Sequence, residues 1–254
     1  MNTTKKLNKN IIMYEFRNIL GNPFIFLFGV FLPVFMSVVI SKAAMYEMGE
    51  NVSTSADTAI SLSVCVLIPM AAVLIGNGCA YSQEVENGIP LRMALFGFKE
   101  RTIFMAKMIA ELIFVTFSLV FYAVCESIFL DIQKPKVSSA ICYIICIWLS
   151  SVIFFTLSTS IANFVKKFGP AFSIVMSLYF LIMMSCGMMG IGQSDLPKVL
   201  RIFSKMLPMS YMANDFIDFW QGGSYNFAPM IQAFLFLGAV SGILLFFSTK
   251  RDQS

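Results

Sequence analysis

Histidine is absent from this sequence of 254 residues, and charged residues of either sign are scarce. Without histidine the chain cannot build a Ser-His catalytic triad or a histidine-ligated metal centre. Asp, Glu, Lys and Arg together make up 13% of the chain, whereas typical globular domains carry about 25%. Hydrophobic residues reach 58%. These proportions exclude an ordinary water-soluble domain and indicate a membrane protein.

A phosphate-binding loop of the form GxxxxGK[ST] is also missing, so we expect that this chain does not hydrolyse ATP by itself. Six cysteines lie in or beside apolar segments. Cys142 and Cys146 share a helix face, but no histidine is present to complete a metal site, and we interpret both as packing residues. We therefore assign no catalytic, cofactor-binding or metal-binding residue. The modest net charge of +4 is explained by membrane topology and requires no nucleic acid partner.

Long uncharged runs divide the chain, and each exceeds the roughly 20 residues that a helix needs to cross a bilayer. Backbone polar groups must be satisfied within lipid, and the runs lack the alternating polarity of barrel strands, so they should be helices. The predicted fold class is all-α, a single transmembrane domain over residues 1–254. The six predicted spans cover about 23–41, 58–81, 108–130, 138–163, 170–190 and 227–248.

The distribution of Lys and Arg sets the expected orientation, because positive loops favour the cytoplasmic side. With the N-terminus inside, twelve basic residues fall on the cytoplasmic side and six outside. The inner set is Lys5, Lys6, Lys9, Arg17, Arg92, Lys99, Arg101, Lys107, Lys166, Lys167, Lys250 and Arg251, and the outer set is Lys42, Lys134, Lys136, Lys198, Arg201 and Lys205. We predict a multi-pass plasma-membrane protein with both termini cytoplasmic. The first apolar run is too long for a cleavable signal peptide and should remain as an anchor.

Two amphipathic regions flank the spans. Residues 5–20 predict a helix lying in the cytoplasmic interface, with a polar tail as the alternative. Its apolar face would carry Leu7, Ile12, Phe16, Ile19 and Leu20. Residues 194–221 predict two short helices outside, separated by Pro208 and forming a re-entrant hairpin. The alternative is a pair of helices resting on the outer leaflet.

The loop between the second and third spans, residues 82–106, carries the most informative pattern. Acidic Glu84 and Glu86 precede Gly88, and Gly97 follows about two turns of amphipathic sequence. Glycines at both ends predict a short helix set off from its neighbours.

Three local patterns, in order and within a six-span frame, resemble the membrane subunit of ABC type-2 exporters. Residues 15–24, followed by a span containing Pro33, look like that family's interfacial helix and opening span. Residues 84–88 look like its cytoplasmic coupling segment, and residues 196–211 are similar to its motif before the last span. The sequence departs from the family pattern at Ile89, Gly97, Phe98, Ala106 and Leu207.

The resemblance implies a half-transporter. Two permeases, identical or homologous, would bind two cytoplasmic ATPase subunits that carry the ATP and Mg, and substrate would leave between the permeases. The implied ATPase-coupling residues are Glu84, Glu86, Gly88, Arg92, Leu95 and Phe96. We expect the two glutamates to engage donors on the ATPase or to orient the short helix, and Leu95 and Phe96 to be its apolar anchor. The implied residues of the outer hairpin are Pro197, Pro208 and Tyr211.

Two other classes of function stay open. Glu111 and Glu126 in the third span are candidate pathway carboxylates for an ion-coupled secondary transporter, although we expect both to reach interfacial water. Asp215 and Asp218, spaced i, i+3, are candidates for a membrane-embedded enzyme, although a solvated helix face explains them as well. The abundance of Phe and Met favours an amphipathic substrate, such as a bacteriocin-like peptide or a hydrophobic drug.

Overall fold

A computed structural model of the chain describes residues 7–48, 54–188 and 196–252. Its described residues form helices and no strands, and six of the helical segments are long and apolar enough to cross a membrane. The prediction of an all-α membrane protein with six spans is confirmed. Parts of three predicted segments, residues 5–6, 189–190 and 194–195, lie outside the described residues.

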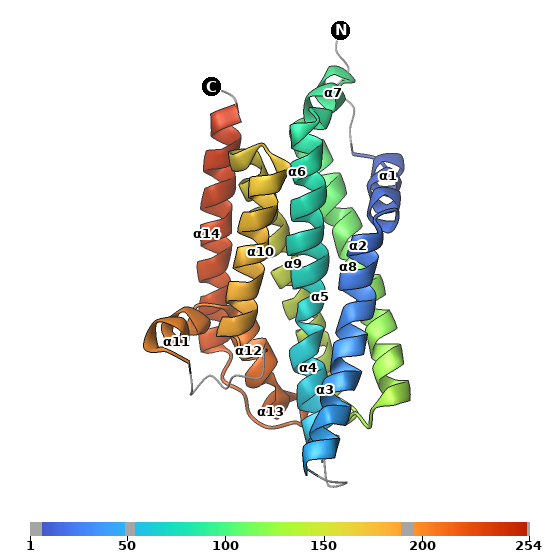
Figure 1. Cartoon of the computed structure of the whole chain (residues 1–254), viewed down its shortest axis with the longest axis vertical. Coiled ribbons are helices and arrows are strands. Elements are labelled where there is room, and N and C mark those ends of the chain that lie inside the picture. The colour runs from blue at the N-terminus through green and yellow to red at the C-terminus, as the bar shows by residue number, and fades with distance from the viewer. Residues whose placement is uncertain (1–6, 49–53, 189–195, 253–254) are drawn as a thin grey trace.

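The six spans follow one another as an up-and-down bundle (Figure 1). The first comprises α2 (Pro23–Phe26), the π-helix η1 (Leu27–Phe31) and α3 (Leu32–Met48), and the second comprises α4 (Thr54–Cys65), α5 (Leu67–Pro69), the π-helix η2 (Met70–Asn77) and α6 (Gly78–Glu86). The others are α8 (Glu100–Phe129), α9 (Val137–Val165), α10 (Phe168–Ser185) and α14 (Ala228–Asp252). The short helices are α1 (Lys9–Leu20), α7 (Ile89–Leu95), α11 (Lys198–Lys205), α12 (Pro208–Asn214) and α13 (Phe216–Trp220).

The second span is the centre of the bundle. Its apolar stretch is 78% buried within the protein, whereas that of α14 is only 22% buried. Small residues allow this burial: a Cβ on Gly29 would stand 2.8 Å from Cβ of Ala72, and one on Gly76 would stand 2.9 Å from Ile25. Such close backbone approach is one source of helix association in lipid, where apolar burial by itself gives little advantage.

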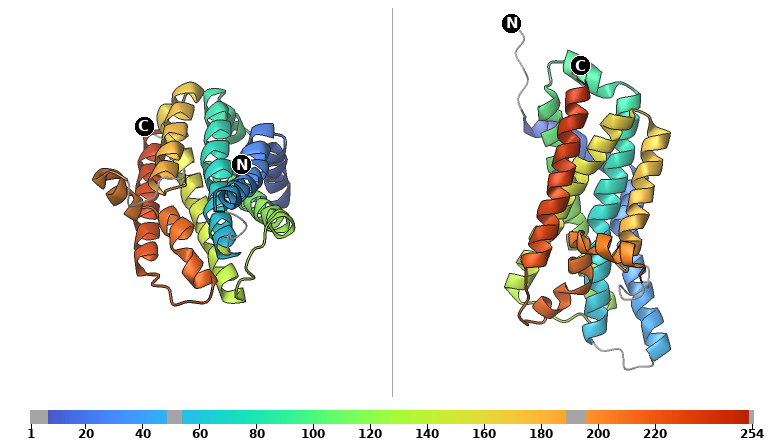
Figure 2. Two further views of the ribbon diagram at one scale, coloured as in Figure 1. Left: turned by 60° about the horizontal axis from the view of Figure 1, so that its bottom comes forward. Right: turned by 90° about the vertical axis from the view of Figure 1, so that its left-hand side faces the viewer.

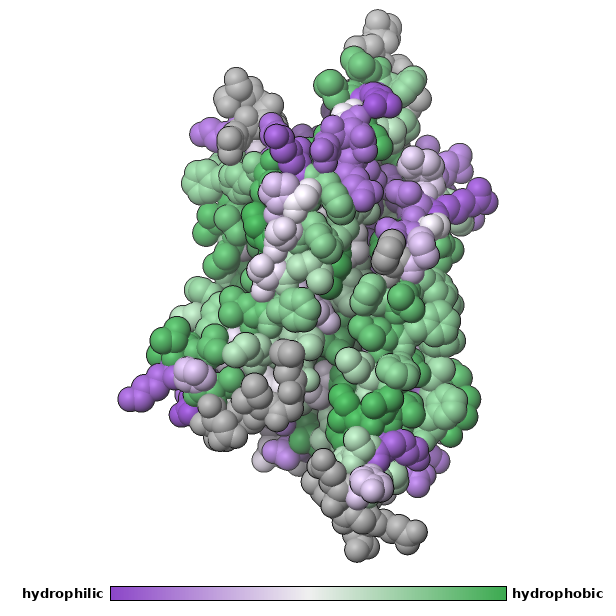
Figure 3. All heavy atoms as spheres, in the orientation of Figure 1, coloured by the Kyte–Doolittle hydropathy of each residue, from purple (hydrophilic) through white to green (hydrophobic). Residues whose placement is uncertain are grey.

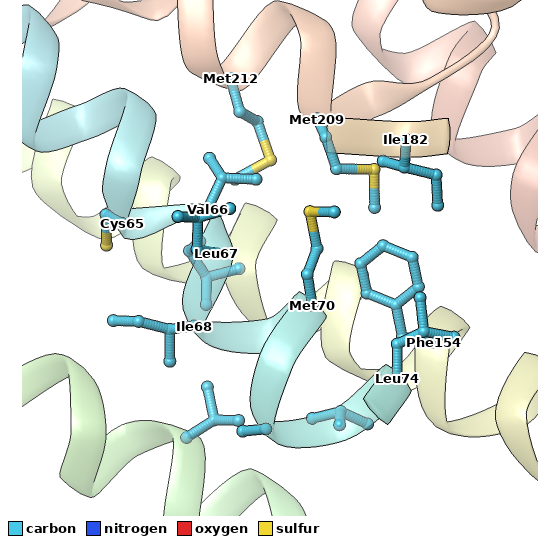
Figure 4. Packing of buried hydrophobic residues seen from close by; sticks show 14 of the residues in the cluster. Cys65, Val66, Leu67, Ile68, Met70, Leu74, Phe154, Ile182, Met209 and Met212 are labelled. Atoms are coloured by element: carbon cyan, nitrogen blue, oxygen red, sulfur yellow. The ribbon is translucent and has the colours of Figure 1, made fainter. Parts of the chain in front are cut away.

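Both irregular helical segments lie beside prolines. η1 ends two residues before Pro33, and η2 begins directly after Pro69. Pro33 lacks a backbone N–H and its ring displaces the carbonyl of Gly29, four residues earlier, so the wider turn of η1 relieves the conflict. η2 follows its proline, so this cause does not apply to it. The two π-helices contact each other. Met70 of η2, Phe154 of α9 and Met209 of α12 fill the interior (Figure 4).

The two ends of the bundle differ in structure. At one end, here called the α7 end, lie α1, α7 and the C-terminal end of α14; α11, α12 and α13 lie at the other, the α13 end (Figures 1 and 2). An even number of spans places the beginning of α1 and the end of α14 on one side. Polar residues gather at the α7 end, above a broad apolar belt (Figure 3).

Helix α1 lies across the bundle and packs on α8 (Figure 2). The side chains that it buries are Ile11, Glu15 and Ile19, spaced one turn apart. The apolar face expected from the sequence is therefore divided: Ile19 is buried, but Leu7 and Leu20 are exposed.

We predict that the α7 end faces the cytoplasm. In a variant without native cysteines, Lys134→Cys, in the exposed connection between α8 and α9, should react with a membrane-impermeant maleimide in intact cells. Lys167→Cys, in the exposed turn between α9 and α10, should react only after permeabilisation. The reverse labelling pattern would contradict this orientation.

Candidate functional site

The chain between α6 and α8 is bent at two glycines, and α7 lies between the bends. Gly88 has φ +68 and Gly97 has φ +86, left-handed values that other residues rarely adopt. A Cβ on Gly88 would meet nothing within 4 Å, so glycine serves the backbone conformation there and not close packing. Arg92 braces the first bend, because its Nη2 donates to the carbonyl of Asn87 at 2.7 Å.

Helix α7 presents an apolar surface to the outside of the protein. Leu91 is 69% exposed, Leu95 81% and Phe96 69%. None of the residues of α7 is buried. Single exposed apolar residues are ordinary, but two on α7 and a third directly after it, at the polar end of a bundle, indicate a contact surface.

A buried ion cluster lies directly behind α7. Lys107 of α8 donates from Nζ to Glu84 Oε1 at 2.7 Å and to Glu15 Oε2 at 2.9 Å. Asn18 also donates to Glu84, at 3.3 Å. The cluster therefore joins three separate segments, α1, α6 and α8, at one ammonium group.

Because the cluster is largely removed from water, the charge of each member is stabilised by the other members. Burial raises the pKa of the Glu15 carboxyl above its ordinary value, and the Lys107 ammonium lowers it in part. Removing charges from water is expensive, and hydrogen-bonded partners are what offset it. Loss of Lys107 would leave two carboxylates close together without a counter-ion.

Glu86 connects the same segment to a fourth helix. Its Oε2 accepts from the backbone N–H of Phe168 at 2.7 Å. Phe168 is the first residue of α10, where backbone N–H groups have no partner within the helix and the helix dipole favours a carboxylate. We expected Glu84 and Glu86 to engage donors of an ATPase or to orient the short helix. The structure gives both of them donors within the chain, and these bonds fix the end of α6 from which α7 projects.

The two candidate pathway carboxylates are both buried. Glu126 is enclosed, which corrects the expectation that it reaches interfacial water, whereas Glu111 lines a hollow at the α7 end. Glu111 is 4% exposed and Glu126 1%. Neighbouring helices cover them, since α1 packs across one end of α8 and α3 packs along it. Ser37 of α3 donates to Glu126 Oε2 at 2.8 Å. Within the described part of the chain, Glu111 Oε2 and Glu126 Oε1 have no hydrogen-bond partner.

The residues expected in the outer hairpin begin or brace its helices. Pro197 immediately precedes α11, and Pro208 is the first residue of α12. The Tyr211 hydroxyl donates to the carbonyl of Lys205 at 3.0 Å, linking α12 to the end of α11. Helix α12 packs against α4 and α14, so the hairpin closes the α13 end of the bundle.

Asp215 and Asp218 lie at the start of α13 and are both exposed. Partial burial raises the pKa of Asp215, and the charge of Asp218 raises it further. No group of three or more Asp, Glu, Cys or His side chains suited to a metal occurs among the residues that the structure describes.

Sequence reasoning missed the partners of the charged residues. Lys107 lies 92 residues from Glu15, and Glu86 lies 82 residues from Phe168. One signal was present in the sequence: Glu15 is a carboxylate spaced one turn from Ile11 and from Ile19, which predicts a charge on an apolar face. A charge in that position requires a buried partner.

Six apolar helices, with a short exposed helix braced at one end, define a multi-pass membrane protein. A family model for the ABC-2 type transporter matches residues 7–218. The chain belongs to the ABC-2 type transporter family and is a membrane permease of an ABC transporter. Members of this family normally work with ABC ATPase subunits. Comparison with curated proteins found no match.

We predict that Lys107→Met destabilises the protein by about 3–5 kcal/mol, because it leaves the buried Glu15 and the partly buried Glu84 without their counter-ion. Unfolding by SDS in mixed micelles measures the change. Lys99→Met, an exposed cation directly before α8, is the matched control and should change stability by no more than about 0.5 kcal/mol. Equal effects of the two variants would show that the cluster does not stabilise the fold.

Proposed function

We propose that this permease is the membrane half of an ATP-driven exporter and that α7 is the surface on which a separate ATPase subunit docks. The observation that carries the proposal is that apolar side chains at α7 are exposed while hydrogen bonds hold the segment behind them in place. Leu91, Leu95 and Phe96 project outward, while the helix they stand on is held from behind by Glu84 and Glu86. Aromatic and aliphatic side chains that enter a pocket supply most of the energy of such contacts.

The bonds behind α7 offer a physical route for transmitting movement. A displacement of α7 would move Glu84 and Glu86 at the end of α6. The movement of Glu84 would be transmitted through Lys107 to α8 and α1, and that of Glu86 to the first turn of α10. Ionic contacts of this kind allow packed helices to move as rigid bodies while short connections change shape.

The rest of the assembly follows from this role. Two permeases, identical or homologous, would pair in the plasma membrane, with two ATPase subunits supplying ATP and Mg and both termini on the cytoplasmic side. The permease would bind no cofactor and catalyse no reaction. An amphipathic peptide or a hydrophobic drug remains our proposed substrate, because Phe and Met together account for 45 of the 254 residues (27 Phe, 18 Met) and form adaptable apolar surfaces.

A secondary transporter is the second candidate, since Glu111 and Glu126 each bury an oxygen that has no partner in the described structure. The two candidates differ in their energy source. Transport in sealed vesicles that requires ATP, and that persists after a protonophore abolishes ion gradients, supports the exporter. Transport driven by an ion gradient without ATP supports the secondary transporter.

We predict that Phe96→Asp abolishes co-purification with the partner ATPase and ATP-dependent transport, because a charge would enter the apolar contact. The expected loss of binding free energy is about 2 kcal/mol or more.

Val137→Asp is the control for this experiment. Val137 is 76% exposed and begins α9, where an acidic residue suits the helix dipole. It should leave both assembly and transport unchanged. If Phe96→Asp still assembles and transports normally, α7 is not the docking surface.

A further inference from the structure

The α7 end contains a cavity of about 1050 Å³ within a single permease. Its walls come from α1, α6, α7, α8, α9 and α14, so it does not depend on a second copy of the chain. Cavities that hold drug-sized ligands have volumes of about 300–1000 Å³. The space is large enough for a small organic molecule or a side chain of a peptide.

The wall of the cavity carries one more carboxylate than it carries cations. The carboxylates are Glu15, Glu84, Glu100 and Glu111, and the cations are Arg17, Lys107 and Lys166. The Lys107 ammonium already donates to Glu15 and Glu84. If every group is ionised, four negative charges face three positive charges, so the lining carries one net negative charge.

Glu111 is the member of this set that lacks a complete set of partners. It is 4% exposed, and its Oε2 has no hydrogen-bond partner among the residues that the structure describes. A buried carboxylate oxygen in that state is costly, whereas an ammonium or guanidinium group would satisfy it with a charge-assisted hydrogen bond. Because Glu111 also lines the cavity, a cationic ligand there would lie close to this carboxylate and offset part of the cost.

Apolar and aromatic surface lies beside the carboxylates. Phe104 and Phe155 line the cavity and contact each other edge to face, with ring centroids 5.0 Å apart. Leu245 lines it from α14. Aromatic rings accept both the apolar body of a ligand and a nearby cation.

We propose that this cavity is an entry site for an amphipathic cation, a primary ammonium or guanidinium carried on an apolar body, with Glu111 as its counter-ion. The inference rests on the proposed export function and narrows its substrate class. It also places initial binding inside each permease, before passage between two permeases.

Binding to the permease alone, in lipid nanodiscs and without ATPase, tests the site. The probes are 2-phenylethylammonium and its neutral analogue 2-phenylethanol, compared by isothermal titration calorimetry. We expect the ammonium to bind and Glu111→Gln to weaken its binding by about tenfold or more, since the variant removes a buried charged partner. The alcohol should bind weakly and equally to both proteins.

Glu126→Gln is the matched control, because Glu126 is a buried carboxylate on the same helix that does not line the cavity. It should bind the ammonium as the unmodified protein does. A second measurement does not require Glu111 to be changed: Thr249→Cys, at the α14 edge of the cavity, should be protected from maleimide by the ammonium in a variant without native cysteines.

Equal binding of ammonium and alcohol, equal binding to Glu111→Gln and the unmodified protein, or absence of both binding and protection would overturn the cation site. None of these results depends on the ATPase. If the cation site is wrong, co-purification with the ATPase still tests α7 docking. If α7 docking is wrong, the binding measurement still tests the cation site.

Discussion

The arrangement of α1, α6 and α8 at the α7 end depends on how one buried ammonium is neutralised. Lys107 lies within a transmembrane helix, and an unpaired charge there would be strongly unfavourable. Its two carboxylate partners come from α1 and from the end of α6, at 2.9 and 2.7 Å. Satisfying this one charge therefore holds α1 across the bundle and sets the point from which α7 projects. Glu86 connects this group of helices to a fourth, α10, by accepting a hydrogen bond from the backbone N–H of Phe168.

Polar contacts also join the helices near the α13 end, with a packed apolar centre between. Ser41 of α3 donates to Asp57 of α4, and Ser37 donates to Glu126 of α8 at 2.8 Å. Lipid offers helices little hydrophobic reason to associate, so such contacts and close packing of small residues must hold the bundle. The central span, with Gly76 against Ile25, illustrates the packing component.

The proposed entry site shares residues with the ion cluster behind the proposed docking surface. Glu15 and Glu84 line the cavity and also hold Lys107 behind α7. A cation that binds beside Glu111 changes the electrostatic field at the cluster through which α7 is braced. Substrate entry and ATPase docking would then act on the same set of charges, which is a compact arrangement for coupling the two events.

The sequence by itself determined the membrane class, the six helical spans and the short helix between Gly88 and Gly97. These features follow from local rules, namely the length of apolar runs, the need to satisfy backbone groups in lipid and the conformational freedom of glycine. Only the tertiary structure decided that Glu84 and Glu86 bind within the chain, that Glu111 and Glu126 are buried, and that a cavity lies inside one permease. The reason is physical: burial and ion pairing depend on which helices pack together, and Lys107 and Glu15 meet across 92 residues of chain.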